Sequence, residues 1–415
     1  MSYYRCLSTL GNAVKKNSQE HAFSELVKRL SRFASHDELI EYSQRPIDYC
    51  YGNHMIEACS PQHSTRLCLI KTAADLHEQL LVRVAHCICH FQYLPFLPAA
   101  NPTLLSINER YWKLFKKLAH FSTIKTEADE EKFFELINLF KAQNNDIIGQ
   151  LSSGCREAAK YFKTYDIMKT FLDNVLQTRL SMRLLSDHYR ELHKQKKEPK
   201  PNDQWRGAIC MNFSPAKLVQ QCIADVSSVC FETYGVVPPV HVENHLHQPI
   251  PYFPDIVEYI VRELLKNSMR ALVEYHTVLF NDLTHVKTFF EDHRQDPLCK
   301  VLISADPEDE HFTISIQDRG GGIDEPIENI FQYLFTGGTA KEEKEHNSTY
   351  FPYSYQDPSI QFSKRMYGYG FGLPICSLYA QFFGGSLTFA QVPRIGTDVY
   401  LRLGFIHTDS ERIKI

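Results

Sequence analysis

The stretch DIVEYIVRELLKNSMRALVEYH, residues 255–276, decides the fold, because it predicts one long helix with two different faces. Ile260 and Leu264 belong to its apolar face, whereas Glu263, Asn267 and Arg270 follow one another at helical spacing on a polar face. A polar stripe is ordinarily the solvated side of a helix. Asparagine is a poor helix former, however, so its central position raises the question of whether this stripe faces a ligand.

A second informative stretch, HFTISIQDRGGGI, covers residues 311–323. Apolar residues alternate with polar ones, which predicts a strand covered on one face. The strand ends at Asp318 and continues directly into three glycines, Gly320 to Gly322. Bare backbone after an acid allows a ligand to approach, with the carboxylate free to accept a hydrogen bond from an amine. A flexible hairpin turn explains the same residues equally well.

The third stretch, GYGFGLPICSLYAQFFGG, covers residues 368–385 and places glycines at alternate positions before an apolar run. Pro374 near the start of that run and Gly384 after its end predict a helix. A glycine-rich turn that leads into a helix presents unpaired N–H groups and the positive end of the helix dipole, which suits phosphate. Taken alone, the stretch is equally compatible with a mobile turn.

The commoner nucleotide-binding motifs are absent from the sequence. No GxxxxGK[ST] loop occurs, and GxGxG is not the dinucleotide-binding GxGxxG. The VAIK, HRD and DFG motifs of eukaryotic protein kinases are missing as well. A nucleotide site in this chain therefore has to be of another kind.

The length of 415 residues and the apolar content of 43% allow two or three domains with a large core. From about residue 20 to 193 the pattern is helical throughout, which predicts a helical bundle. The basic segment 193–204 carries two prolines and predicts a linker, after which strands and helices alternate. We therefore expect a bundle over residues 36–195 and an α/β domain over residues 205–410.

The formal charge of −4 indicates no general attraction to nucleic acid, and no apolar stretch is long enough to cross a membrane. The twelve cysteines are scattered; Cys87 and Cys89, flanked by His86 and His90, are interpreted as buried free thiols because no second ligand pair follows at zinc spacing. The first 19 residues are acid-poor and Ser-rich, which predicts a weak mitochondrial presequence within residues 1–35.

Four segments in order, ELLKNSMRA, DRGGG, GYGFG and GTDVYL, resemble the nucleotide-binding boxes of the GHKL superfamily of gyrases, chaperones and histidine kinases. More closely, the chain resembles the mitochondrial kinases of 2-oxo acid dehydrogenase complexes, over about residues 45–412. VRVAHCICHFQYLPFLPAANPTLL and FLDNVLQTRLSMRLL are similar to bundle segments of that family. The resemblance implies a four-helix-type bundle followed by a GHKL (Bergerat) α/β sandwich that binds ATP.

The resemblance also implies roles for individual residues. Asn267 would coordinate Mg²⁺, Asp318 would read the adenine amino group, and Glu263 would act as the base that deprotonates the nucleophile. A flexible lid would run from about residue 338 to 367. The further residues expected to contact ATP are Arg270, Gly320, Gly322, Thr336, Gly337, Gly368, Tyr369, Gly370, Phe371, Gly372, Leu373 and Thr397.

In the bundle, Arg179 and Arg183 match a pair that lines a 2-oxo acid effector pocket in the family, and two guanidiniums one turn apart could clamp a carboxylate. Interhelical ion pairs are the alternative. The segment LPFLP, residues 94–98, matches a region that docks a lipoyl domain of the complex core. Tyr189 takes the place where the family usually carries a histidine beside the nucleotide domain, with His188 one position earlier.

The implied function is a protein serine/threonine kinase of the mitochondrial matrix, with ATP and Mg²⁺ as cofactors, that inactivates the decarboxylase subunit of a 2-oxo acid dehydrogenase complex. The ending GTDVYLRL and a short tail without an Asp-Trp pair favour the branched-chain complex, with the pyruvate complex as the alternative. A homodimer without nucleic-acid partners or membrane insertion is expected. An ATP-driven conformational machine is the rival class, and His77 with Glu78 lacks the proline of a phosphoacceptor box.

Overall fold

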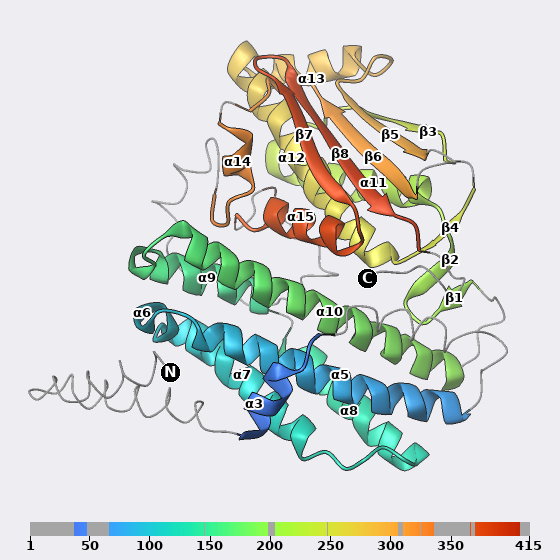
Figure 1. Ribbon diagram of the computed structural model, residues 1–415. Helices are drawn as coiled ribbons and strands as arrows, with labels where there is room; N and C mark the ends of the chain where they lie inside the picture. The colour runs from blue at the N-terminus through green and yellow to red at the C-terminus, as the bar shows by residue number, and fades with distance from the viewer. Residues whose placement is uncertain are drawn as a thin grey trace, which may run out of the picture.

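The computed structural model describes residues 37–47, 66–144, 146–197, 204–246, 248–305, 310–323, 325–335, 366 and 370–406. Within these ranges the chain forms a helical bundle followed by an α/β sandwich that lies against it (Figure 1). This arrangement confirms the predicted fold class. The predicted presequence and most of the predicted lid lie outside the described residues.

The bundle is built from long helices that run beside one another (Figure 1). Side chains begin two of them: Asn101 accepts hydrogen bonds from the backbone N–H groups of Thr103 and Leu104, and Thr126 forms a capping box with Asp129. The helices are α3 (Asp37–Gln44), α5 (Arg66–Gln92), α6 (Phe96–Ala99), α7 (Pro102–Ala119), α8 (Glu127–Gln143), α9 (Ile147–Ala158) and α10 (Tyr165–Lys197), with a 3₁₀ turn at Ala159–Tyr161.

The predicted linker begins too early in the sequence. Helix α10 continues through residues 193–197, and Lys197 forms an ion pair with Glu131 of α8 at 2.8 Å. The helix is therefore four residues longer than the sequence predicts. Charged residues can continue a helix, and the prolines that would end it come only after Lys197. The domain bounds 36–195 and 205–410 stay a prediction.

The α/β part contains a five-stranded sheet in the order β3-β5-β6-β8-β7, in which only β3 and β5 pair in parallel. A small antiparallel sheet, β1-β2-β4, precedes it. The strands are β1 (Trp205–Arg206), β2 (Ile209–Phe213), β3 (Val240–Asn244), β4 (Ile250–Tyr252), β5 (Cys299–Ala305), β6 (His311–Asp318), β7 (Ser386–Val392) and β8 (Gly396–Gly404). The helices are α11 (Pro215–Tyr234), α12 (Pro254–Phe280), α13 (Leu283–Asp292), α14 (Ile327–Ile330) and α15 (Gly372–Phe382).

One face of the large sheet carries the core. In β8, Val399 and Leu401 are buried whereas Tyr400 and Arg402 between and beside them are exposed, as expected for a strand covered on one side. Helix α12 packs on β6, and α15 packs on β7, β8 and α12 as well as on α10 of the bundle (Figure 1). Helix α15 therefore lies where the sheet, the long polar-striped helix and the bundle meet.

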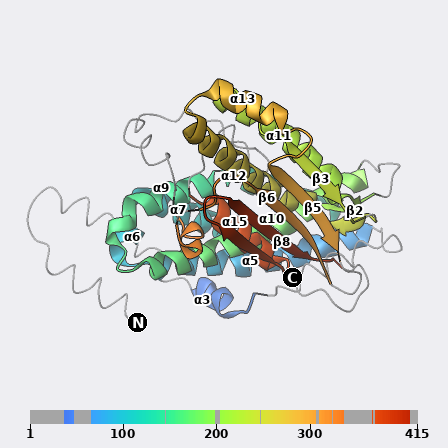
Figure 2. The same cartoon turned by 90° about the horizontal axis from the view of Figure 1, so that it is seen from above.

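The segment after α12 forms a helix of its own. Residues 276–300 contain the end of α12, then α13 and the start of β5, and α13 lies beside α11 at the β3 edge of the sheet (Figure 2). Asp282 begins α13 by accepting a hydrogen bond from the N–H of Thr284 at 2.9 Å.

Two expectations, about membrane-spanning helices and about the cysteines of residues 86–90, can be compared with the described part of the chain. No helix there is both long and apolar enough to cross a lipid bilayer. Cys87 is buried, Cys89 is half-buried, and both are free thiols on α5. His86 binds the backbone carbonyl of Arg45 at 2.8 Å. These contacts agree with the structural interpretation of this segment.

Candidate functional site: residues of α12, the end of β6 and the start of α15

The polar stripe of α12 lies partly open, as its spacing predicts. Ile260 and Leu264 are buried against the sheet, and Glu263, Asn267 and Arg270 are half-buried on the other side. One turn of helix separates Glu263 from Asn267, so a carboxylate and an amide oxygen face the same region. The stripe therefore presents a carboxylate and an amide oxygen side by side.

The start of α15 lies against Glu263. A side chain at Gly372 would begin 2.6 Å from Oε2 of Glu263, so the Glu263 carboxylate lies directly against the backbone of Gly372 and would have to move for a larger residue. Phe371 and Gly372 begin the helix, and its first N–H groups have no partners within the helix. The carboxylate that we expect to act as a base thus lies beside backbone donors suited to phosphate.

Glu263 has a partner that the sequence analysis missed. Lys266, three residues on, forms a close ion pair with its Oε1, and the side chains are only 3% and 18% exposed for Lys266 and Glu263. Buried Cys376 of α15 completes this neighbourhood: burial raises the pKa of its thiol, and the charge of Glu263 raises it further. The spacing of three residues was a visible signal, but burial of the lysine was not.

We expect that replacing Lys266 with methionine lowers the free energy of unfolding by about 3 kcal/mol, because the Glu263 carboxylate then stays in a poorly solvated place without its cation. Chemical denaturation measures this effect. The double variant that also carries Glu263→Gln should recover most of the lost stability; if it is no more stable than Lys266→Met alone, the ion pair does not have this role.

Asp318 lies at the end of β6, beside Ser268 of α12, which comes five residues after Glu263. It is 4% exposed, and its Oδ1 accepts a hydrogen bond from the N–H of Gly320 at 3.0 Å. Burial raises its pKa to about 6, although hydrogen bonds from Gly320, Ser268 and Thr397 act in the opposite direction. Near neutral pH the carboxylate is ionised, buried and able to accept a hydrogen bond from a ligand amine.

The surroundings of Asp318 also bring together predicted residues. Thr397 is its direct partner in the β6–β8 register and is 6% exposed. Gly320 lies against the backbone of α12, where an added carbon would approach Ala271 to 2.8 Å. Ser268, which the sequence analysis missed, is the one polar residue among apolar neighbours on its face of α12, and that interruption was a readable signal.

The remaining predicted residues are distributed as follows. Gly322 lies next to the backbone of Val392, and Gly370 lies next to Leu334 and Phe335, whereas Leu373 is half-buried in the first turn of α15. Four predicted contacts lie outside the described residues: Thr336, Gly337, Gly368 and Tyr369.

Tyr333 connects the start of α15 to the bundle. Its hydroxyl donates to Asp173 of α10 at 2.6 Å, and its backbone N–H donates to the hydroxyl of Tyr165 at 2.7 Å. The ring of Tyr333 lies 5.0 Å from that of Phe371, centre to centre, at the start of α15. The next residue, Leu334, donates its N–H to the carbonyl of Gly370 at 2.9 Å. The bundle therefore helps to position the glycine-rich turn.

Comparison with known proteins shows to which family the chain belongs. The family model described as mitochondrial branched-chain alpha-ketoacid dehydrogenase kinase matches residues 53–210, and the model described as histidine kinase-, DNA gyrase B-, and HSP90-like ATPase matches residues 254–406. The chain is 30% identical over 346 residues to the mitochondrial pyruvate dehydrogenase (acetyl-transferring) kinase of Arabidopsis thaliana. The aligned region covers 83% of this chain and 87% of the relative. The chain belongs to the mitochondrial 2-oxo acid dehydrogenase kinase family.

More distant members of the dehydrogenase kinase family match over a similar length. The human mitochondrial pyruvate dehydrogenase kinase isozyme 3 is 26% identical over 357 residues, which are 82% of this chain and 80% of the relative. The mitochondrial pyruvate dehydrogenase kinase of Drosophila melanogaster is 24% identical over 361 residues, or 83% and 80%. Bundle and ATPase-like part are thus matched together, in the same order.

The bundle holds a small cavity at the predicted effector pair. It has a volume of about 30 Å³ and lies between α7, α8 and α10. Its lining residues are Tyr111, Phe140, Lys141, Asn144, Arg179, Arg183, Ser186 and Asp187. Both predicted arginines therefore line one cavity. Arg183 pairs with Asp187 within α10 at 3.5 Å, and Asp187 also pairs with Lys141 of α8 at 2.8 Å.

Tyr189 does not lie beside the nucleotide domain, where the resemblance placed it. Tyr189 is fully buried inside the bundle, where its hydroxyl forms a short hydrogen bond to Glu130 of α8. His188 is the residue that faces the nucleotide domain: it accepts a hydrogen bond from the N–H of Ala208 at 3.2 Å and packs edge-to-face on Phe253. Successive helical residues point about 100° apart, and the sequence pattern around both is too similar to tell them apart.

The His77 ring contacts neighbouring residues of the bundle. Its Nε2 lies 2.8 Å from the carbonyl oxygen of Leu118, and its ring lies edge-on to Phe133. A phosphoacceptor histidine needs an accessible nitrogen. This contact agrees with the expectation that His77 is not one.

Proposed function

We propose that this protein transfers the γ-phosphoryl group of ATP to a serine on the decarboxylase subunit of a mitochondrial 2-oxo acid dehydrogenase complex, and so inactivates it. The observation that carries the proposal is the placement of Glu263 of α12 against the first residue of α15, with buried Asp318 at the end of β6 beside a later part of α12. Membership of the dehydrogenase kinase family supports the same reaction.

In the proposed mechanism Asp318 accepts a hydrogen bond from the adenine amino group and Thr397 lies beside the base. Gly320 and Gly322 let the backbone after β6 pack closely against Ala271 and Val392 beside the base, and the N–H groups at the start of α15 bind the phosphates. Arg270 adds positive charge on the same stripe. Phosphoryl transfer asks mainly for such positioning and charge stabilisation.

Glu263 orients the serine hydroxyl and accepts its proton, while Lys266 holds the carboxylate in place. Mg²⁺ fits the half-buried amide of Asn267, because this ion prefers oxygen ligands and needs only one or two from the protein. When bound, the ion would neutralise charge on the phosphates.

The proposal has one decisive experiment. The protein is incubated with labelled ATP and either the purified branched-chain or the purified pyruvate decarboxylase, and the labelled protein is tested for acid stability. Acid-stable label on a decarboxylase serine is the expected result. Acid-labile label would indicate phosphohistidine, and ATP hydrolysis without labelled protein would indicate a conformational machine, so either would contradict the proposal.

The same experiment chooses the complex. The C-terminal GTDVYLRL favours the branched-chain complex, as does the family model that matches the bundle. Three relatives compared above are named as pyruvate dehydrogenase kinases. The decarboxylase that is labelled faster at equal concentration is the substrate.

We infer that the protein works in the mitochondrial matrix as a homodimer and that the bundle docks a lipoyl domain. Tyr93 and Leu97 support docking because they are 84% and 54% exposed at the end of α5 and in α6, within or beside the predicted LPFLP segment. We infer further that Arg179 and Arg183 bind a carboxylate effector. Both arginines line the same cavity of the bundle.

A further inference from the structure

His193, near the end of α10, has one ring nitrogen without a hydrogen-bond partner in the described part of the chain. Its Nδ1 lies 2.8 Å from Oε1 of Glu130 of α8, whereas its Nε2 is buried and has no such partner. The residue is only 2% exposed, and the ring of Phe134 stacks on it with 3.7 Å between the ring centres. Buried polar atoms are normally paired, so Nε2 is an open position in a ring that is otherwise held firmly.

The hydrogen bonds around Glu130 determine which nitrogen of His193 carries the proton. The hydroxyl of Tyr189 donates a short hydrogen bond to the Glu130 carboxylate. Burial and the neighbouring Glu130 raise the pKa of this hydroxyl, so it stays a donor. An ionised carboxylate only accepts, so Nδ1 of His193 donates to Glu130, and Nε2 of the neutral ring carries a free lone pair. Metal-binding histidines commonly have their other nitrogen held by a carboxylate in this way.

Glu131 places a second ligand beside the free nitrogen. Its Oε2 lies 3.7 Å from Nε2 of His193, which is too far for a hydrogen bond. Two ligand atoms on one tetrahedral Zn²⁺ are about 3.3 Å apart, because each lies about 2.0–2.1 Å from the ion. One ligand atom from each of Glu130, Glu131 and His193 lies within 4.8 Å of the others. An ion between Nε2 and Oε2 therefore requires only a small movement of Glu131.

The helix dipole does not account for this cluster. Acidic residues are common in the first turn of a helix, where the dipole favours negative charge. In α8 Asp129 already has this role through its capping box with Thr126. Glu130 is instead turned into the bundle and is 5% exposed, against His193. A simple ion pair with a protonated ring would still leave the N–H at Nε2 without an acceptor at hydrogen-bond distance.

Lys197 lies where a cation would approach Glu131. Its Nζ is 2.9 Å and 2.8 Å from the two carboxylate oxygens of Glu131. The Lys197 side chain is 57% exposed, so its ammonium can move into water and leave the carboxylate to another cation. A divalent ion and Lys197 therefore compete for one carboxylate.

We propose that His193 and Glu131 bind a Zn²⁺ ion, through Nε2 and the carboxylate, while Glu130 holds the ring from its other side and water completes the coordination. Zinc accepts both imidazole and carboxylate ligands, whereas Mg²⁺ prefers oxygen ligands alone. The ion joins α8 to the end of α10. Two residues further along α10, the side chain of Gln195 binds the backbone N–H and carbonyl of Gly207, each at 3.0 Å. Zinc would thus stabilise the end of the bundle that contacts the α/β domain.

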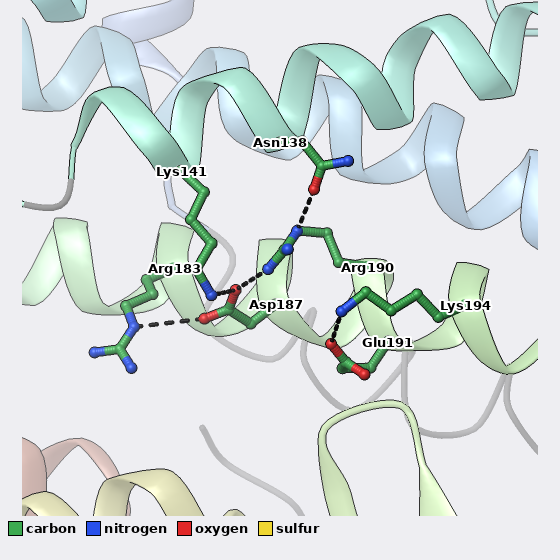
Figure 3. Close-up of polar contacts among 7 residues, drawn as sticks. All are labelled: Asn138, Lys141, Arg183, Asp187, Arg190, Glu191 and Lys194. Carbon is green, nitrogen blue, oxygen red and sulfur yellow. Dashed lines mark hydrogen bonds and ion pairs between the residues drawn. The ribbon is translucent and has the colours of Figure 1, made fainter. Parts of the chain in front are cut away.

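Other contacts hold α8 and α10 together without an ion (Figure 3). Nζ of Lys141 lies 2.8 Å from Oδ1 of Asp187, and Nε of Arg190 donates to Oδ1 of Asn138 at 2.6 Å. A variant of His193 should therefore keep the fold of the bundle.

The test is titration of the full chain, first freed of metal with a chelator, with ZnCl₂ in an isothermal titration calorimeter and without nucleotide. The wild-type protein should bind one equivalent of Zn²⁺ that His193→Gln and Glu131→Gln both lose, and MgCl₂ should give no such binding. Zinc held elsewhere, for example by thiols, remains in the variants and is separated by that comparison. Glu191→Gln is the matched control: Glu191 lies on α10, pairs with Lys194 at 2.7 Å and should leave zinc binding unchanged (Figure 3).

Two further variants test the positions assigned to Glu130 and Lys197. Glu130→Gln should weaken zinc binding by about 10- to 100-fold, as expected for the partner of a ligating histidine. Lys197→Met should bind zinc about tenfold more tightly, because it removes the competing ammonium. Lys197 lies at the surface, so this variant gives an answer even where a buried substitution lowers stability. Zinc should also raise the melting temperature of the wild-type protein by at least about 2 °C and leave that of His193→Gln unchanged.

Several results would overturn the inference. The zinc equivalents bound by His193→Gln could equal those of the wild-type protein, which would remove the site. Unchanged zinc affinity of Lys197→Met would contradict binding at the Glu131 carboxylate, and unchanged affinity of Glu130→Gln would contradict its hold on the ring. None of these measurements involves ATP or a decarboxylase, so a failure of the proposed kinase function would appear separately, in the labelling experiment.

Discussion

Replacing Glu263 with glutamine should reduce the rate of phosphoryl transfer by about 100-fold or more while ATP still binds. The amide has nearly the same shape as the carboxylate beside Gly372, but it cannot accept the proton of the serine hydroxyl. Single-turnover labelling of the decarboxylase measures the transfer, and a fluorescent ATP analogue measures binding in the same preparation.

The control for this variant lies on the same helix. Glu274 is further along the polar face of α12, where its Oε1 accepts a hydrogen bond from the hydroxyl of Tyr234 at 3.1 Å. Glu274→Gln should therefore leave the transfer rate within about twofold of the wild-type value. A fully active Glu263→Gln protein would exclude Glu263 as the base, and a protein that no longer binds ATP would place its role in binding instead.

Replacing Asp318 with asparagine should have opposite effects on ATP affinity and on stability. The asparagine cannot serve as a charged acceptor for the adenine amino group, so we expect ATP to bind about 10- to 100-fold more weakly. Asp398→Asn is the matched control, since Asp398 follows Thr397 on β8 but is paired with Arg319 at 3.4 Å. Its ATP affinity should not change.

The stability effect follows from the raised pKa of Asp318. The pKa of the Asp318 carboxyl is about 6 in the folded protein, whereas the pKa of an aspartate in an unfolded chain is about 3.9. Both states are protonated below about pH 4, so the folded state carries no penalty there; as pH rises through 4 to 6, only the unfolded state ionises freely, and stability falls. Above pH 6 the penalty is complete, at roughly 3 kcal/mol before the lost hydrogen bonds of the variant are subtracted.

Without ATP, the Asp318→Asn protein should therefore melt at a higher temperature than the wild-type protein at pH 8, and this difference should shrink towards pH 5. Differential scanning calorimetry at the two pH values measures it. A difference that does not vary with pH would show that the Asp318 carboxyl is not held in the folded protein in the way its burial implies.

Much of the site could be predicted because its signals are local. The period of apolar residues predicts α12 and places Glu263, Asn267 and Arg270 on one face. The end of β6 at Asp318 is marked by an acid before three glycines, and α15 by glycines before an apolar run. Such features depend on neighbours within a few residues, and the structure confirms the elements that they predict.

Other parts of the site could not be predicted, because they depend on contacts between distant segments. Burial of Lys266 beside Glu263 follows from the packing of α15 on α12. The contact of Tyr333 with Asp173 joins residues 160 positions apart in the chain. The direction of Tyr189, into the bundle rather than towards the nucleotide domain, depends on how α10 is rotated between two neighbours.

By itself, the sequence determined the fold class, the order of bundle and α/β domain, and the residue types of a nucleotide pocket, because periodicity and glycine placement act along the chain. Only the tertiary structure decided which charges meet. Arg179 and Arg183 are equivalent in the sequence, since both are arginines one turn apart on one predicted helix. In the fold, Asp187 lies beside Arg183, and Arg179 lines the cavity. Electrostatic partners are set by distance and burial, and both arise only when helices from separate parts of the chain pack together.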